Sequence, residues 1–210
     1  KPIVALLKAW FGANATAENE YGYQWLPKNN PANMPIQPQF FSKMEEGQFK
    51  LLLNWGSNST VSIPDRKLVA RGLSSLEMLV VADIFNTETA QFWKEEGLNP
   101  AKIPTEVIFL PAAFVYEKAG SMTNSSRLVQ WKEVALKPLN DCHPDLDMLD
   151  HIFKRVRALY IGSNDPKDEP ILKANWDYGD HEASALKVLQ ELGGYNDTTG
   201  KPIAAIGEYL

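Results

Sequence analysis

Polar side chains that could bind a ligand follow a short apolar run in the first half of the chain. Residues 79–82 read Leu-Val-Val-Ala, Asp83 follows at once, and Thr87-Glu88-Thr89 comes a few residues later. An aspartate at the end of a strand can accept hydrogen bonds from two ribose hydroxyls or from the edge of a guanine. The spacing leaves a second interpretation open, in which Asp83 caps a helix that begins near Thr87.

Two more apolar runs lead into polar segments of the same kind. Residues 56–60 read GSNST, and residues 117–120 read EKAG. Small residues such as Gly56 and Ser57 let a backbone approach a pyrophosphate closely. Ligands of open parallel sheets bind beyond the carboxyl ends of the strands. We therefore expect the polar segments to line one crevice, of a shape and chemistry that suit a nucleotide.

Several other kinds of site are not supported by the sequence. Neither G-x-G-x-x-G nor G-x-x-x-x-G-K-[ST] is present, so the usual dinucleotide fingerprint and the P-loop are both excluded. Cys142 is the one cysteine, which excludes an intrachain disulfide and leaves a cysteine-built metal site without ligands. The histidines, His143, His151 and His181, show no metal-ligand spacing. Cys142 and His143 are adjacent and precede a proline, so we do not interpret them as a nucleophile and its base.

The elements that would position the polar segments alternate between strand and helix. Residues 49–55 form an apolar run of strand length, 64–76 carry leucine and valine at helical spacing, and 77–83 again have the pattern of a strand. A third apolar strand is expected at 106–113. A strand, helix and strand in this order favour parallel strands buried by helices. The predicted fold is a three-layer α/β sandwich with a mainly parallel sheet, its strands at about 50–55, 78–82 and 106–110.

The rest of the chain is expected to extend this domain. Residues 1–45 form an irregular arm that packs on the domain: 3–10 are apolar and periodic, and four prolines then forbid a long helix. Residues 46–165 form the α/β cofactor-binding domain, and 166–210 form a loop-rich C-terminal extension. Further elements are expected as a strand at 127–136 and as helices at 145–160 and 183–192, the last ended by Gly193-Gly194.

Composition sets wider limits. With 210 residues, 44% of them hydrophobic, the chain can bury a real core. Its formal net charge of -5 argues against a nucleic-acid partner, which normally requires clustered Lys and Arg. No apolar stretch approaches the roughly 20 residues that span a bilayer, so direct membrane insertion is not expected. Because the chain starts at Lys1 without an initiating Met, we expect it to be a piece of a longer protein.

Longer motifs carry a family resemblance that covers nearly the whole chain. D-x-F-x-T-E-T-A is followed by L-P-A-A, by E-K-x-G and by "KPLNDCHPDLDML", in this order. The combination resembles the catalytic subunit of molybdenum- or tungsten-dependent formate dehydrogenases, within the molybdopterin oxidoreductases of the dimethyl-sulfoxide-reductase type. The front arm and the tail are similar to the respiratory branch of these enzymes.

The resemblance implies that this domain binds the guanosine end of a molybdopterin guanine dinucleotide. Asp83 and Asp145 match the family's acidic residues and would accept hydrogen bonds from the nucleoside. Lys118 matches the lysine of E-K-x-G and would neutralise phosphate or bond the base, while Asn58 would bond the cofactor through its amide. Taken alone, Lys118 also fits a solvated surface charge, and Asp145 fits an N-cap of the 146–160 helix. Ser59 stands where the family often has a proline.

The implied parent enzyme oxidises formate to carbon dioxide at a Mo or W centre. The family's metal-binding cysteine or selenocysteine, its histidine and its cluster cysteines have no counterpart here. We therefore expect no catalytic or metal-binding residue in the chain, no activity of the isolated chain and no cofactor bound tightly to it. The implied partners are the remainder of the catalytic subunit and an iron-sulfur electron-transfer subunit, in the periplasm or alternatively the cytoplasm. A non-catalytic scaffold that binds no pterin is the alternative.

Overall fold

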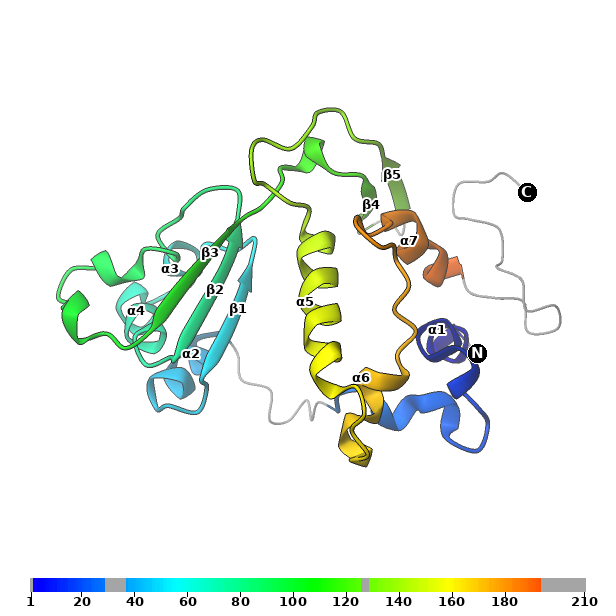
Figure 1. Ribbon diagram of the computed structural model, residues 1–210. Helices are drawn as coiled ribbons and strands as arrows, with labels where there is room; N and C mark the ends of the chain where they lie inside the picture. The colour runs from blue at the N-terminus through cyan, green and yellow to red at the C-terminus, as the bar shows by residue number, and fades with distance from the viewer. Residues whose placement is uncertain (1, 29–36, 126–128, 194–210) are drawn as a thin grey trace. The chain divides into compact units, whose positions relative to one another are not determined.

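The computed structural model describes residues 2–28, 37–125 and 129–193 (Figure 1). Contacts group the chain into two compact units. Unit 1 comprises Lys1–Lys28, Tyr116–Lys137 and Leu146–Leu210, and unit 2 comprises Asn29–Val115 and Pro138–Asp145. The domain ranges expected from the sequence, 1–45, 46–165 and 166–210, stay predictions.

Unit 2 is built on a parallel sheet of three strands. These are β1 (Leu51–Trp55), β2 (Met78–Asp83) and β3 (Glu106–Pro111), in the spatial order β1-β2-β3. Leu53 pairs with Val80, which pairs with Ile108 on its other side. The predicted mixed α/β class and the predicted parallel strands are confirmed. The apolar runs form strands because their β-branched and leucine side chains suit a buried, pleated surface.

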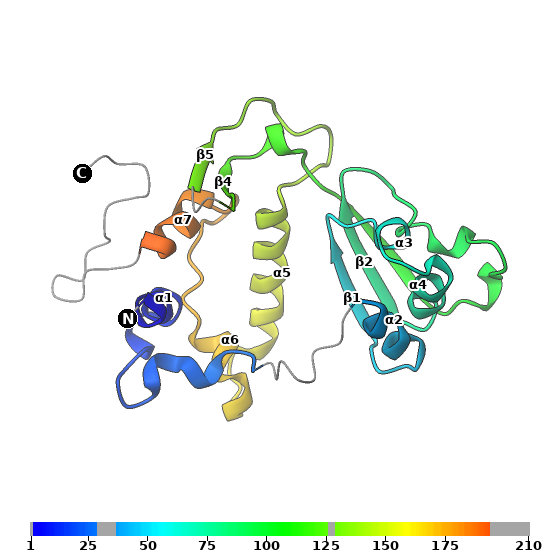
Figure 2. The same cartoon turned by 180° about the vertical axis from the view of Figure 1, so that it is seen from behind.

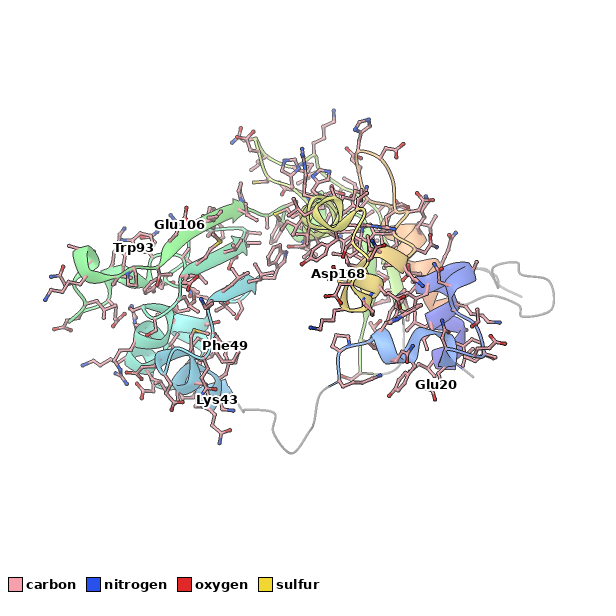
Figure 3. All side chains as sticks on the ribbon, turned by 60° about the horizontal axis from the view of Figure 1, so that its bottom comes forward. Glu20, Lys43, Phe49, Trp93, Glu106 and Asp168 are labelled. Carbon is pink, nitrogen blue, oxygen red and sulfur yellow. The ribbon has the colours of Figure 1, made fainter. Side chains whose placement is uncertain are left out.

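Helices α2 (Gln37–Glu45) and α4 (Arg66–Leu73) pack on one face of this sheet (Figure 1). Leu79 and Val81 of the central strand are fully buried in the resulting core. Phe49 and Trp93, both labelled in Figure 3, are partly buried against it. Leu53 and Ile108 on the opposite face are exposed. Burial of each large apolar side chain in the core contributes about 1.5–3 kcal/mol.

A glycine lets the two helices approach closely. A Cβ atom at Gly72 of α4 would lie 2.8 Å from the backbone oxygen of Phe41 in α2. Helix α4 begins after Asp65, whose carboxylate accepts a hydrogen bond of 3.0 Å from the backbone N–H of Leu68. This N-cap satisfies one of the backbone donors that every helix leaves unpaired at its start.

Two short helices of unit 2 differ from the expectation. The arm was expected to be irregular, yet α2 covers nine residues, with Pro38 in its first turn. A proline costs nothing there because its missing N–H would have no partner inside the helix. Helix α3 (Ser59–Ser62) is a single turn in the loop after β1, where no helix was expected. Two 3₁₀ turns, η4 (Phe92–Lys94) and η5 (Pro100–Lys102), also belong to the unit.

Unit 1 is mainly helical and carries a small hairpin (Figure 2). Strands β4 (Gly120–Thr123) and β5 (Val129–Lys132) pair antiparallel, so the predicted strand at 127–136 is shorter than expected. The expected helices are α1 (Pro2–Phe11), α5 (Asp145–Tyr160) and α7 (Ala185–Gly193). The other elements are η1 (Gly12–Asn14), η2 (Glu20–Trp25), η6 (Val115–Glu117), η7 (Pro166–Asp168) and α6 (Glu169–Lys173). Gly194, residues 195–210, residues 126–128, Pro31 and Pro35 lie outside the described residues.

Two buried carboxylates and one half-buried carboxylate hold residues 176–183 of unit 1 in place. The Trp176 indole donates to Asp150 at 2.8 Å, and the backbone N–H of Ala183 donates to Asp147 at 2.6 Å. The Tyr178 hydroxyl donates to Glu191 of α7 at 2.5 Å. These bonds tie residues 176–183 to α5 and α7, and those to Asp147 and Asp150 satisfy carboxylates that water reaches poorly.

Candidate functional site

The carboxyl ends of the three strands of unit 2 lie level with one another. Trp55 of β1 pairs with Ala82, and Asp83 at the end of β2 pairs with Pro111 at the end of β3. The loops that follow β1 and β2 therefore leave the same edge of the sheet. This is the edge at which parallel α/β sheets bind their ligands.

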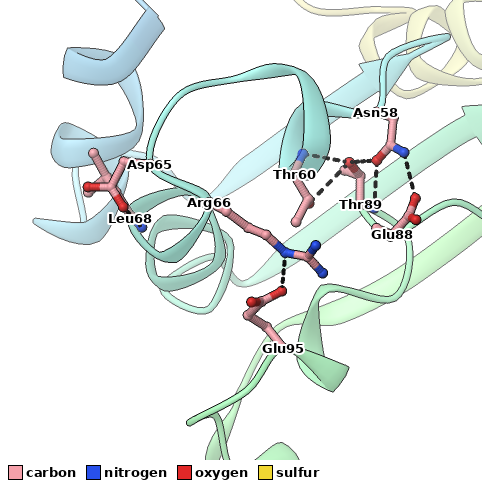
Figure 4. Close-up of polar contacts among 8 residues, drawn as sticks. All are labelled: Asn58, Thr60, Asp65, Arg66, Leu68, Glu88, Thr89 and Glu95. Carbon is pink, nitrogen blue, oxygen red and sulfur yellow. Dashed lines mark hydrogen bonds and ion pairs between the residues drawn. The ribbon is translucent and has the colours of Figure 1, made fainter.

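Asn58 joins these two loops (Figure 4). Its side-chain oxygen accepts hydrogen bonds from the backbone N–H of Thr89 at 3.2 Å and from the Thr89 hydroxyl at 2.9 Å. Its side-chain nitrogen donates to Glu88 at 2.6 Å. Both acceptor positions of the amide are thus filled by protein, and one Nδ2 hydrogen has no partner among the described residues. The expected bond from Asn58 to a cofactor stays a prediction, and it would have to use the remaining Nδ2 hydrogen.

Thr89 does not face the crevice, although the sequence suggested that the whole Thr87-Glu88-Thr89 cluster would. Its side chain is fully buried, and so is that of Thr60. The backbone N–H and the hydroxyl of Thr60 donate to the Thr89 hydroxyl at 3.1 and 3.2 Å. No local pattern predicts these bonds, because 29 residues separate the two threonines.

Asp83 is half-buried at the end of β2. One carboxylate oxygen, Oδ1, accepts from the backbone N–H of Ile84 at 2.8 Å, and Oδ2 has no protein partner among the described residues. Turns follow at 88–91, and η4 begins only at Phe92. The interpretation of Asp83 as the cap of a helix starting near Thr87 is therefore wrong.

Asp145 lies at the same edge of unit 2. His143 pairs with Ala112 just beyond β3. Its carbonyl accepts from the backbone N–H of Ala113 at 2.8 Å, and its backbone N–H donates to the Pro111 carbonyl at 3.1 Å. Asp145 follows two residues later as the first residue of α5. The helix dipole favours an acidic side chain at this position, so a structural role for Asp145 stays open beside a ligand-binding one.

Lys118 belongs to unit 1, between η6 and β4, where it is half-buried. The Lys132 ammonium donates to the Lys118 carbonyl. Burial lowers the pKa of Lys132, and the nearby positive charge of Lys118 lowers it further. The structure thus brings Asn58, Asp83 and Asp145 to one edge of unit 2, whereas the convergence of Lys118 with them stays a prediction.

Two buried polar atoms near this edge lack hydrogen-bond partners among the described residues. They are Nε1 of Trp55, at the end of β1, and Oγ1 of Thr87, in the loop after β2. Thr87 also lines a cavity of about 380 Å³, together with Glu88 and the exposed Phe85. An unpaired buried donor or acceptor costs about 1–3 kcal/mol, so a ligand that satisfied these atoms would gain affinity.

Arg66 was not singled out from the sequence, although it lines the same cavity. It is the first residue of α4 and pairs with Glu95 through Nε (Figure 4). The signal that could have indicated Arg66 is its place in the first turn of the helix that follows the GSNST loop. The guanidinium nitrogens that do not face Glu95 suit an anionic group in the cavity.

Neither a cluster of potential metal ligands nor a membrane-spanning helix is found in the part of the chain that the structure describes. Among those residues, no group of three or more His, Cys, Asp and Glu side chains could hold a metal ion. Nor is any described helix both long enough and apolar enough to cross a bilayer.

A parallel sheet with helices packed on it defines an α/β domain, and the carboxyl edge of its sheet carries carboxylate, amide and hydroxyl groups. Residues 13–155 match the molybdopterin oxidoreductase family, and the chain belongs to this family. It is 34% identical to the nitrate-inducible formate dehydrogenase major subunit and 35% identical to the formate dehydrogenase-O major subunit, both of Escherichia coli K12. Each match covers 100% of this chain and 22% of the relative.

A third relative is the formate dehydrogenase major subunit of Haemophilus influenzae, 34% identical over 93% of this chain and 19% of the relative. The chain thus spans about a fifth of the length of these relatives. The family resemblance indicated by the sequence motifs is confirmed.

Proposed function

We propose that this chain is a cofactor-binding segment of a formate dehydrogenase catalytic subunit, and that the carboxyl edge of its sheet holds the guanosine end of a molybdopterin guanine dinucleotide. Full-length relatives named as formate dehydrogenases support the enzyme class. The family match supports a molybdopterin cofactor. When bound, the cofactor would supply the Mo or W centre that takes two electrons from formate.

The observation that carries the proposal is the set of unused polar atoms at the sheet edge. Asp83 offers a carboxylate oxygen, beside the level ends of the strands, that no described residue of the chain binds. Trp55 and Thr87 offer a buried donor and a buried hydroxyl without partners among the described residues. A guanosine carries ribose hydroxyl and amino donors for the carboxylate, and carbonyl and ring-nitrogen acceptors for the indole N–H. The residues present therefore fit this group.

Each residue would bind or orient the cofactor rather than take part in bond breaking. Asp83 and Asp145 would accept from the nucleoside, and Asn58 would donate its remaining amide hydrogen. Lys118 would neutralise a phosphate. The partners we propose are the remainder of the catalytic subunit and an iron-sulfur electron-transfer subunit, in the periplasm.

The test replaces Asp83 in the full-length protein. Asp83→Ala removes both acceptor oxygens and leaves nucleoside donors unpaired, at a cost of about 1–3 kcal/mol. The expected result is a lower pterin content per polypeptide with unchanged circular dichroism. Asp83→Asn, which keeps one acceptor oxygen and the shape, is expected to retain more cofactor than the alanine variant.

Full cofactor occupancy in Asp83→Ala would overturn the assignment of this edge. A wild-type full-length protein that contains no pterin would instead support a non-catalytic scaffold. Pterin is measured by its fluorescence after oxidative release from the denatured protein.

A further inference from the structure

The hydroxyl group of Thr89 uses all of its hydrogen-bonding capacity inside unit 2. A hydroxyl provides one donor and two acceptor positions. Thr89 donates to the Asn58 oxygen at 2.9 Å and accepts from the backbone N–H and the hydroxyl of Thr60 at 3.1 and 3.2 Å (Figure 4). Because the side chain has 0% relative exposure, a ligand cannot reach it.

These bonds connect two loops that are far apart in sequence. Asn58 and Thr60 follow β1, whereas Thr89 follows β2. The backbone N–H of Thr89 adds a bond of 3.2 Å to the Asn58 oxygen, so one side-chain oxygen holds both the main chain and the side chain of Thr89. A change in the distance between the loops would break several of these bonds together.

The loop after β1 is itself anchored to its strand. Asn54, a buried residue of β1, donates to the Ser57 carbonyl at 2.6 Å and accepts from the Ser59 hydroxyl at 3.0 Å. Ser57 and Ser59 therefore tie the loop after β1 to the interior of that strand, and their chain neighbours Asn58 and Thr60 bond Thr89 in the loop after β2. Buried hydrogen bonds such as those of Asn54, Thr60 and Thr89 favour a single arrangement of the groups they join.

We infer that Thr89 is a positioning residue for the cofactor cradle, an inference that rests on the proposed function. The cradle is formed by the strand-end loops that carry Asn58, Asp83 and Thr87. Its hydroxyl sets the distance between the loop that carries Asn58 and the loop that carries Thr87 and Glu88. Both loops are then in place before a nucleotide arrives, which lowers the ordering cost of binding. Thr89 acts through Asn58 and makes no contact with the ligand.

Four substitutions in the full-length protein test this role. Thr89→Val keeps the side-chain shape but removes three hydrogen bonds, whereas Thr89→Ser keeps the hydroxyl. Thr105→Val is the matched control, because the Thr105 hydroxyl contacts the carbonyls of Leu73 and Leu76 at 2.8 and 2.9 Å, just before β3 begins at the other end of the sheet. Asp83→Ala reports on the cradle itself.

Thr89→Val is expected to release the cofactor about tenfold faster than the wild type, which corresponds to about 1.4 kcal/mol. Thr89→Ser should restore release to within about twofold of the wild type. Thr105→Val should lower the melting temperature but leave release unchanged. The KM for formate of the molecules that retain cofactor should be the same in all variants, since Thr89 affects only cofactor retention.

Release from Thr89→Val that is no faster than from Thr105→Val would overturn the inference. If Asp83→Ala still speeds release in that case, the proposed function stands and only the role of Thr89 fails. If neither variant speeds release, the proposed function fails as well. If Thr89→Val does not fold, Thr60→Val takes its place, because it removes the hydroxyl bond to Thr89 and keeps the backbone bond. Thr60→Val must then release the cofactor faster than Thr105→Val does.

Discussion

The side-chain amide of Asn58 donates a hydrogen bond of 2.6 Å to the carboxylate of Glu88, from one strand-end loop of the parallel sheet to the next. This bond is the largest of the causes that lower the pKa of Glu88, ahead of a bond from its own backbone. The same amide is bound to Thr89 through its oxygen. Asn58 thus joins the two loops through bonds to both Glu88 and Thr89.

Replacement of Asn58 by Ala is expected to raise the pKa of Glu88 toward its ordinary value. The charged carboxylate loses its principal donor in this variant. A lowered folded pKa stabilises the fold above the pKa of the unfolded state, and this contribution is lost as the pH falls through the folded pKa. The variant should therefore lose less stability on acidification. An NMR titration of the Glu88 side-chain carbon measures the change directly.

Asn99→Ala is the control for this titration, because the Asn99 side chain caps η5 by accepting from the backbone N–H of Ala101 and not from Glu88. It should leave the Glu88 titration unchanged. An unchanged Glu88 pKa in Asn58→Ala would contradict the bond seen between the two loops.

Substitution of Gly72 by Ala is expected to destabilise unit 2 by about 1–3 kcal/mol, because the new Cβ would lie 2.8 Å from the Phe41 carbonyl oxygen and force α2 away. The higher helix propensity of alanine offsets part of this loss. Gly120→Ala is the matched control, since a Cβ there meets nothing within 4 Å. Urea unfolding of both variants measures the difference, and equal midpoints would show that α2 and α4 do not pack as described.

The stability of unit 1 is expected to fall as the pH rises past the ordinary pKa of tyrosine. Burial raises the pKa of Tyr178, and its hydrogen bond to Glu191 raises it further. The unfolded chain then loses this proton at a lower pH than the folded chain, so the slope of stability with pH is negative in this range. Tyr178→Phe should show a smaller slope in alkaline thermal melts, and an equal slope would exclude Tyr178 as its source.

The isolated 210-residue chain is expected to show no formate oxidation and no stoichiometric iron or molybdenum. Its sequence holds one cysteine and three histidines, and the described residues contain no cluster that could hold a metal ion. Elemental analysis by mass spectrometry and a dye-reduction assay with formate measure the two properties. A metal bound at one equivalent would show that a ligand set has been overlooked.

The sequence determined the elements whose pattern is local. The strands and α5 lie close to their predicted ranges, because apolar runs and helical spacing are properties of neighbouring residues. The carboxyl ends of parallel strands must share an edge, so the position of Asp83 at that edge also followed from the sequence. Helix α2 was missed because the prolines before it and at its start suggested a break, although Pro38 occupies a turn that tolerates it.

Only the tertiary structure decided which polar side chains bind protein and which remain open to a ligand. The sequence shows three similar polar residues in Asn58, Asp83 and Thr89. In the structure, Asn58 and Thr89 bond each other across 31 residues. One oxygen of Asp83, in contrast, has no protein partner among the described residues. Such pairing depends on how the strands bring distant loops together. Hydrogen-bond capacity is a property of each residue, whereas its use is a property of the packed fold.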